Sequence, residues 1–63
     1  MTDFTADEKY KAILRELKHR RSLYPLLVSR GRMSQEQAKR ELEIMAAIGQ
    51  DYQHELERER FLL

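Results

Sequence analysis

The amino-acid sequence predicts an all-α fold, namely a two-helix antiparallel hairpin with a kink at Pro25 that self-associates into a helical bundle. Three observations support this prediction. Apolar residues recur at helical spacing in two long stretches, a glycine-containing turn separates these stretches, and the middle of the second stretch is apolar on nearly every side. We therefore expect one domain over residues 1–63, with helices at about 5–30 and 35–60 and a turn at 31–34.

The turn between the two helices carries signals for both the end of one helix and the start of the next. Gly31 suits the left-handed conformation just past a helix end, where a Cβ atom is penalised. Ser34 and Gln37 have the spacing of a capping box, and Met33 and Ala38 have that of a hydrophobic staple. Because one helix ends and another begins within about four residues, we expect them to be antiparallel neighbours.

The first helix is predicted to begin after Thr5, which has Glu8 three residues later as in a capping box. Asp7 and Glu8 also favour a helix start, because their charges complement the positive end of the helix dipole. The apolar positions follow a helical period through Ala6, Tyr10, Ile13, Leu17, Tyr24 and Leu27.

Pro25 is the one residue that opposes a regular first helix. It lacks the amide that would bond to the carbonyl of Arg21, and its ring disfavours helical geometry in the preceding residue. Either the helix kinks near residues 22–25 and continues to Arg30, or it ends near Ser22 and a short separate helix follows. We prefer the kink, because the long second helix requires a partner of similar length.

The second helix has a seven-residue repeat, which is typical of a seam against another helix and runs through Ala38, Leu42, Met45, Gly49, Tyr52 and Leu56. Laid back along the hairpin, Leu17 is expected opposite Gly49, and Ile13 opposite Tyr52. Glycine costs about 1 kcal/mol relative to alanine in a helix interior. We interpret Gly49 as space for Leu17, with a helix kink at Gly49 as the alternative.

The segment from Ile44 to Gly49 predicts self-association. It is apolar nearly all the way round, and a hairpin covers only one side of such a helix. A thin rod of 63 residues also buries little apolar surface against the entropy of ordering its chain. We therefore expect a homodimer or higher homo-oligomer, or a different protein as the partner. The predicted oligomer interface consists of Leu17, Tyr24, Leu27, Ile44, Met45, Ala47, Ile48 and Tyr52.

Charge is divided between the two halves of the chain. The formal net charge is only +1, but residues 1–32 contain eight basic and four acidic side chains, and residues 33–63 contain four basic and seven acidic ones. A basic arm beside an acidic arm favours pairing within or between chains. Because exposed ion pairs stabilise little, this division selects orientation more than it adds stability.

The densest basic run suggests a second kind of partner. Arg15, Lys18, Arg20 and Arg21 are typical of side chains that contact nucleic-acid phosphates. The opposing interpretation is a solvated face that pairs with nearby carboxylates. Arg20 or Arg21 is also expected near the seam, where a buried guanidinium would need a carboxylate partner. The near-zero net charge favours the solvated face.

The sequence predicts no catalytic, metal-binding or cofactor-binding residues. The chain has no cysteine, which excludes disulfides and thiolate metal sites. His54-Glu55 matches the start of a zinc-protease motif, but Arg58 stands where the second histidine is required. No serine, histidine and acid set and no glycine-rich phosphate loop is present. With no signal-peptide pattern and no apolar run of about 18 residues, we expect no membrane association and a cytoplasmic location.

Several short segments form a combined pattern, which reads Leu23-Tyr24-Pro25-x-Leu27-Val28, Gly31-x-Met33-Ser34-x-Glu36-x-Ala38, Arg40-Glu41, Met45, Ala47-Ile48 and Asp51-Tyr52. This pattern covers about residues 15–53 and resembles a group of very small bacteriophage and prophage proteins of uncharacterised function. The turn is also similar to the short C-terminal helical hairpin domain (SHOCT) of bacterial proteins. The resemblance implies an accessory protein in the cytoplasm of a bacterial host cell, and it assigns no functional residue.

The leading hypothesis from the sequence is therefore a non-enzymatic phage or prophage accessory protein. It would act by protein–protein interaction as an oligomeric helical bundle, with a host or phage protein as a further partner. The alternative is a small nucleic-acid-binding accessory factor that uses the basic first helix. A third hypothesis is a purely structural bundle within a larger assembly.

Overall fold

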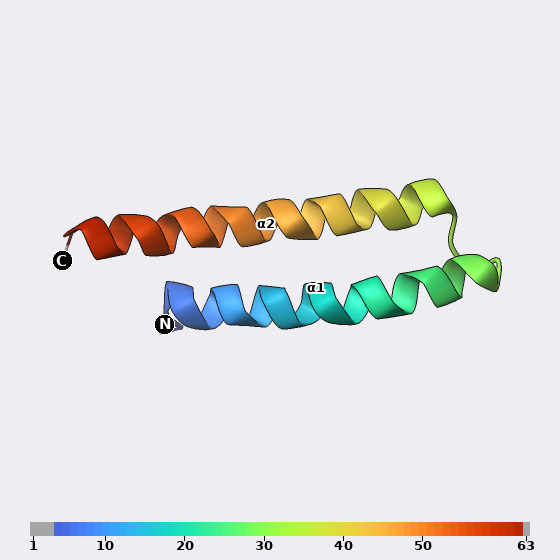
Figure 1. The fold of residues 1–63 in the computed structure, drawn as a ribbon, viewed down its shortest axis with the longest axis horizontal. Coiled ribbons are helices and arrows are strands. Elements are labelled where there is room, and N and C mark those ends of the chain that lie inside the picture. The colour runs from blue at the N-terminus through green and yellow to red at the C-terminus, as the bar shows by residue number, and fades with distance from the viewer. Residues whose placement is uncertain (1–3, 63) are drawn as a thin grey trace.

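The computed structural model describes residues 4–62, which form two helices, α1 (Ala6–Ser29) and α2 (Gln35–Leu62). The helices lie side by side and antiparallel (Figure 1), and no strand occurs among these residues. The predicted all-α hairpin is confirmed, and its bounds differ from the observed ones by two residues or fewer. The predicted domain also includes residues 1–3 and Leu63, which lie outside the described residues.

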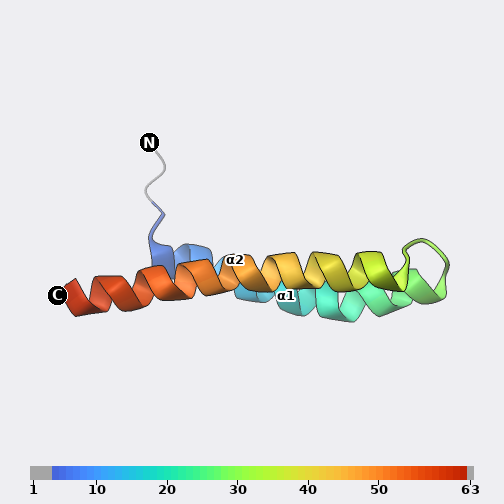
Figure 2. The same ribbon diagram turned by 90° about the horizontal axis from the view of Figure 1, so that it is seen from above.

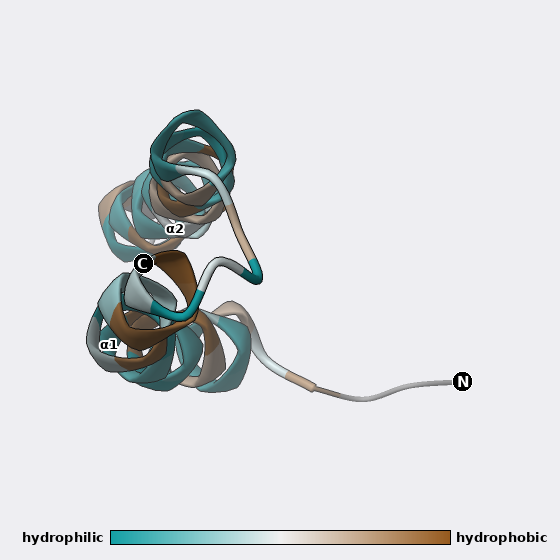
Figure 3. Ribbon diagram, turned by 90° about the vertical axis from the view of Figure 1, so that its right-hand side faces the viewer, coloured by the Kyte–Doolittle hydropathy of each residue, from teal (hydrophilic) through white to brown (hydrophobic). Residues whose placement is uncertain are grey.

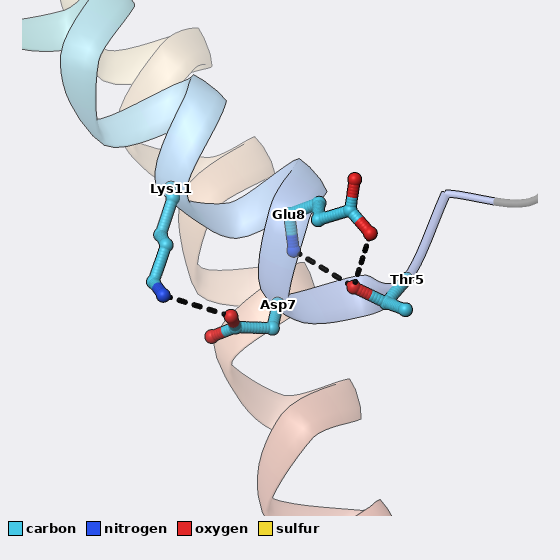
Figure 4. A network of polar contacts seen from close by, with 4 residues as sticks. All are labelled: Thr5, Asp7, Glu8 and Lys11. Carbon is cyan, nitrogen blue, oxygen red and sulfur yellow. Dashed lines mark hydrogen bonds and ion pairs between the residues drawn. The ribbon is translucent and has the colours of Figure 1, made fainter.

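The start of α1 is fixed by the side chain of Thr5, as the sequence predicts. The Thr5 hydroxyl accepts a hydrogen bond from the Glu8 amide at 3.1 Å and donates one to the Glu8 carboxylate at 3.3 Å (Figure 4). A complete capping box would send that carboxylate to the Thr5 amide instead. In the first turn of α1, Asp7 also forms an ion pair with Lys11, which lies four residues later, at 2.9 Å. These local contacts satisfy part of the unpaired helix terminus and place acidic charge at its positive end.

Helix α1 is continuous through Pro25. Of the two outcomes left open by the sequence, the structure has a single helix that passes residues 22–25 and ends at Ser29. Proline has no amide to donate, so the carbonyl of Arg21 loses its helical partner. Ser22 lies within the helix, and its hydroxyl donates to the carbonyl of Lys18 at 3.4 Å. The kink at Pro25 stays a prediction.

The end of α1 is a Schellman turn built on Gly31. This glycine has a φ of 71°, the left-handed conformation that residues with a Cβ rarely adopt. Its amide donates to the carbonyl of Val28 at 3.0 Å, and the amide of Arg32 donates to the carbonyl of Leu27 at 2.9 Å. The carbonyls of Leu27 and Val28 near the end of α1 are therefore satisfied, and the chain reverses direction.

Helix α2 starts at a serine cap. The hydroxyl of Ser34 accepts a hydrogen bond from the amide of Gln37 at 3.0 Å, and its carbonyl accepts one from Ala38 at 3.0 Å. The predicted helix start is confirmed. Figure 1 shows that α2 then runs back along α1 and continues past the residue where α1 begins.

The hairpin core is one narrow seam between the helices. Its buried apolar side chains are Leu17, Tyr24, Ala38 and Met45. In the end-on view of Figure 3, hydrophobic segments of both helices lie toward the space between them, and hydrophilic segments dominate the outer turns. Figure 2 shows α1 passing from one side of α2 to the other, as the packing of long helices by ridges and grooves produces.

The predicted register of the two helices is wrong by about one helical turn. A Cβ atom placed on Gly49 would lie 3.4 Å from Cγ2 of Ile13, so Gly49 faces Ile13 rather than Leu17. In an antiparallel pair the residue numbers of facing positions have a constant sum. The buried pairs Leu17–Met45 and Tyr24–Ala38 have the same sum as Ile13–Gly49. The Schellman turn causes this shift, because residues 32–34 return along α1 before α2 begins.

The molecule is a thin rod with extents of 48 × 20 × 18 Å. Its radius of gyration is 14.6 Å, whereas a compact chain of this length has about 10.6 Å. The accessible surface is 5,487 Å², compared with about 4,300 Å² for a compact monomer of this mass. One hairpin alone thus leaves about 1,200 Å² more surface in water than a globule would.

Candidate interaction surface

More large apolar side chains are exposed than buried among the described residues. The exposed ones come from both helices and from the segment that precedes α1, and they are Phe4, Leu14, Leu23, Leu26, Ile44 and Phe61. No apolar side chain of the described part of the chain has less than 2% of its surface exposed. The seam is therefore shallow, and apolar surface remains on its outside.

The residues predicted to form an oligomer interface divide into three groups. Three are buried within the single chain, and these are Leu17, Tyr24 and Met45. Three are half-buried at the edges of the seam, and these are Leu27, Ile48 and Tyr52. Two are exposed, and these are Ile44 and Ala47. The first group packs in the α1–α2 seam and is covered before any partner arrives, so the accessible candidates are those of the second and third groups.

Helix α2 carries an exposed row outside the buried seam, and the last member of this row, Asp51, also lies beside the start of α1. The members of the row recur at intervals of four, three and four residues, and we call this row the outer strip: Arg40, Ile44, Ala47 and Asp51. All four residues are exposed. At 3.6 residues per turn they lie about 100° to 160° round the helix from Met45, which points into the seam. This spacing is that of a helix-packing seam with no partner in the single chain.

Three of the four basic residues predicted to make contacts share one face of α1, since Arg15, Lys18 and Arg21 lie within about 120° of its circumference, whereas Arg20 lies on the other side. At 3.6 residues per turn, the four predicted contact residues, Arg15, Lys18, Arg20 and Arg21, spread over more than half of the helix circumference. Arg15, Lys18 and Arg21 are exposed, and Arg20 is half-buried. The four side chains are neighbours in the sequence, but they do not all lie on one surface of the helix.

Arg20 is engaged by a carboxylate of its own helix. Its Nε donates to Oε1 of Glu16 at 2.8 Å, one turn earlier in α1. This hydrogen bond lowers the pKa of Glu16 and raises that of Arg20. Arg20 is half-buried rather than buried, and its carboxylate partner Glu16 comes from the same helix.

A surface hollow lies between the start of α1 and the second half of α2. It includes Phe4, which the sequence analysis did not select, as well as Ile48 and Tyr52. Lys9 also lines it, with its Nζ 5.9 Å from the centroid of the Tyr52 ring. The aromatic face that would attract an external cation thus already has a cation from the chain itself.

The described residues contain no group of three or more histidine, cysteine, aspartate or glutamate side chains placed to hold a metal ion. In the same part of the chain, neither helix combines the length and apolar character needed to cross a membrane. Glu55 is held on the surface by Arg58, whose Nη2 donates to both carboxylate oxygens at 2.6 and 2.7 Å.

Comparisons with protein families, with curated individual proteins and with solved structures return no match. The resemblance to small phage and prophage proteins, and that of the turn to the SHOCT domain, therefore stay predictions.

Proposed function

We propose that this chain is a non-enzymatic accessory protein that acts by protein–protein interaction as a self-associated helical bundle. The observation that supports this proposal most directly is the exposed apolar surface of the single hairpin. Together with the resemblance of residues 15–53, it supports a phage or prophage protein working in the cytoplasm of a bacterial host cell. A host or phage protein is the further partner in this proposal.

The surface area of the hairpin supports self-association. A stable protein interface buries about 800 Å² on each partner. The excess of the hairpin over a compact monomer is about 1,200 Å², so a second copy could cover enough surface to form such an interface. Exposed side chains such as Ile44 and Leu26 would leave water in the process, and each would contribute roughly 1.5 kcal/mol or more if fully buried.

The bend at Pro25 belongs to this proposal. Pro25 is itself exposed, and the two exposed leucines Leu23 and Leu26 flank it. A bend there would change the direction in which these side chains point, because proline leaves one helical hydrogen bond unmade and kinks the axis. The last turns of α1 would then be free to follow the curvature of a bundle.

Nucleic-acid binding receives less support from the geometry. A phosphate-binding surface needs several cations on one face, and α1 offers three, whereas Arg20 lies on the other side of the helix and is paired with Glu16. The net charge of the chain is only +1, which does not favour a strongly basic nucleic-acid binder. Nucleic-acid binding would be supported if the chain bound DNA or RNA at low salt and lost that affinity steeply as the salt concentration rose. In that case Arg21→Ala should weaken the binding.

Sedimentation equilibrium tests the proposal. The mass of one chain is 7.6 kDa, and we expect a solution mass of at least twice that value at micromolar concentrations. Ile48→Glu should return the mass to that of one chain, because a carboxylate at a half-buried apolar position opposes burial in an interface. A wild-type mass of 7.6 kDa at millimolar concentration would reject the proposal.

A further inference from the structure

We infer that the partner of the outer strip is the outer strip of a second copy, with the two α2 helices antiparallel. This inference rests on the self-association proposed above and deepens it, because it assigns the surface and the orientation. Arg40, Ile44, Ala47 and Asp51 meet the same four residues of the partner about a twofold axis. That axis passes between Met45 and Ala46.

The shapes of the side chains in the outer strip fit this antiparallel pairing. In this register Ile44 faces the partner's Ala47, and Ala47 faces the partner's Ile44. A large side chain thus meets a small one twice, which is the alternation that lets two helices interdigitate. Ile44 is 42% exposed in the single chain, so it is free to pack against a partner. A parallel pair would instead set Ile44 against the partner's Ile44 and leave two alanines opposite each other.

The charges at the two ends of the outer strip fit the same pairing. The same register places Arg40 opposite the partner's Asp51 and Asp51 opposite the partner's Arg40, so two opposite-charge pairs flank the apolar centre. Neither residue makes an ion pair within residues 4–62. A parallel pair would place like charges together at both ends, and like-charge contacts are costly at an interface. Charge therefore selects the antiparallel orientation.

The position of the twofold axis along the rod also fits this pairing. In the observed hairpin register the two ends of the rod are the turn at Gly31 and the last described turn of α2. The midpoint between these ends lies beside residues 46–47, within about two residues of the proposed twofold axis. Two hairpins would consequently overlap along nearly their whole length.

The exposed leucines of α1 do not offer an equivalent surface. Leu23 and Leu26 are exposed at the same spacing that Ile44 and Ala47 have in α2. In the matching antiparallel register their flanking residues would be His19 and Arg30. Both are basic, so two copies would bring like groups together where the outer strip brings opposite charges together. The self-complementary surface is on α2.

Site-directed cross-linking tests this seam, because the chain has no cysteine of its own. Ile44→Cys and Ala47→Cys chains, one of them carrying a tag of different mass, are mixed and oxidised. We expect the mixed disulfide to form faster than either homodimeric disulfide. Faster formation of the Ile44→Cys homodimer would contradict the antiparallel orientation. Leu14→Cys is the matched control, since Leu14 is 44% exposed and lies on α1, and it should cross-link slowly.

Charge reversal provides the second readout. Arg40→Asp or Asp51→Arg alone should raise the dimer dissociation constant by about tenfold or more, since each places like charges opposite each other. The double variant should recover most of the affinity. Dimers that sediment normally but show no mixed disulfide and no charge rescue would overturn the seam and leave self-association standing. A chain that sediments as a monomer would overturn both.

Discussion

The two glycines of the chain have opposite roles, and alanine at each should move stability in opposite directions. Gly31 has a φ of 71°, so Gly31→Ala forces a strained backbone and should lower the free energy of unfolding by about 1 kcal/mol. Gly49 lies inside α2, and a Cβ there meets Ile13 at an ordinary contact distance of 3.4 Å. Gly49→Ala should raise the free energy of unfolding by up to about 1 kcal/mol.

Urea unfolding of both glycine variants checks this prediction. Gly49→Leu is the control that tests how closely Gly49 packs against Ile13. The extra atoms of leucine cannot fit there and should destabilise the hairpin. A destabilised Gly49→Ala variant would show that the two helices approach more closely than the structure has them.

The Glu16–Arg20 pair should make the stability of the hairpin depend on pH. The hydrogen bond from Arg20 lowers the pKa of Glu16 from its usual value of 4.5. A carboxylate with a lowered pKa in the folded state contributes stability above its unfolded pKa and loses it as the pH falls through the folded value. Wild type should therefore melt at a higher temperature than Glu16→Gln at pH 7, and the two melting temperatures should converge as the pH falls through the lowered pKa of Glu16.

The comparison variant for this titration is Glu43→Gln. Glu43 is exposed on α2 and makes no ion pair among the described residues. Its melting temperature should stay close to that of wild type across the same range. An equal gap between wild type and Glu16→Gln at pH 3 and pH 7 would show that the Glu16–Arg20 pair does not form in solution.

Helix α1 should gain stability when its proline is removed. Pro25 is exposed and lies inside a continuous helix, where proline costs about 3 kcal/mol relative to alanine. Pro25→Ala restores the amide that bonds to the carbonyl of Arg21, so urea unfolding should show a gain of up to about 3 kcal/mol. A loss of stability would indicate that the bend at Pro25 is required by the packing of a bundle.

The helix ends could be predicted from the sequence because each depends on a few neighbouring residues. The structure has Thr5 and Ser34 as the caps at the helix starts and Gly31 in the left-handed conformation at the helix end, as predicted. Each of these roles depends only on hydrogen bonds and backbone angles within a few residues. The register could not be predicted in this way. It depends on how residues 32–34 return along α1, which is a property of the whole turn, and one turn of shift preserves the same seven-residue pattern.

The outer strip shows a second limit of sequence patterns. Periodicity identified Met45 and Ile44 as interface residues without separating a seam within the chain from a seam between chains. The structure separates them, since Met45 is buried against α1 and Ile44 is left exposed. The N-terminal hollow was not predicted because Phe4 precedes the periodic part of α1 and carries no helical signal.

At the scale of the whole molecule, the proposed self-association depends on how much surface the rod exposes for its mass. A rod of 48 × 20 × 18 Å, in which the described residues include four buried apolar side chains, exposes more area than a compact chain of equal mass. Self-association would cover this area, and folding and binding would then be coupled. For such a protein the midpoint of unfolding depends on concentration, because dissociation favours the unfolded chain at high dilution.

Thermal unfolding followed by circular dichroism over a hundredfold range of protein concentration tests this claim most directly. We predict that the melting temperature of the wild-type chain rises with concentration, and that the rise is lost in Ile44→Glu but kept in Leu14→Glu, a substitution at a similarly exposed position. A cooperative transition whose melting temperature is the same at every concentration would contradict the account, because it would show that one hairpin is stable by itself.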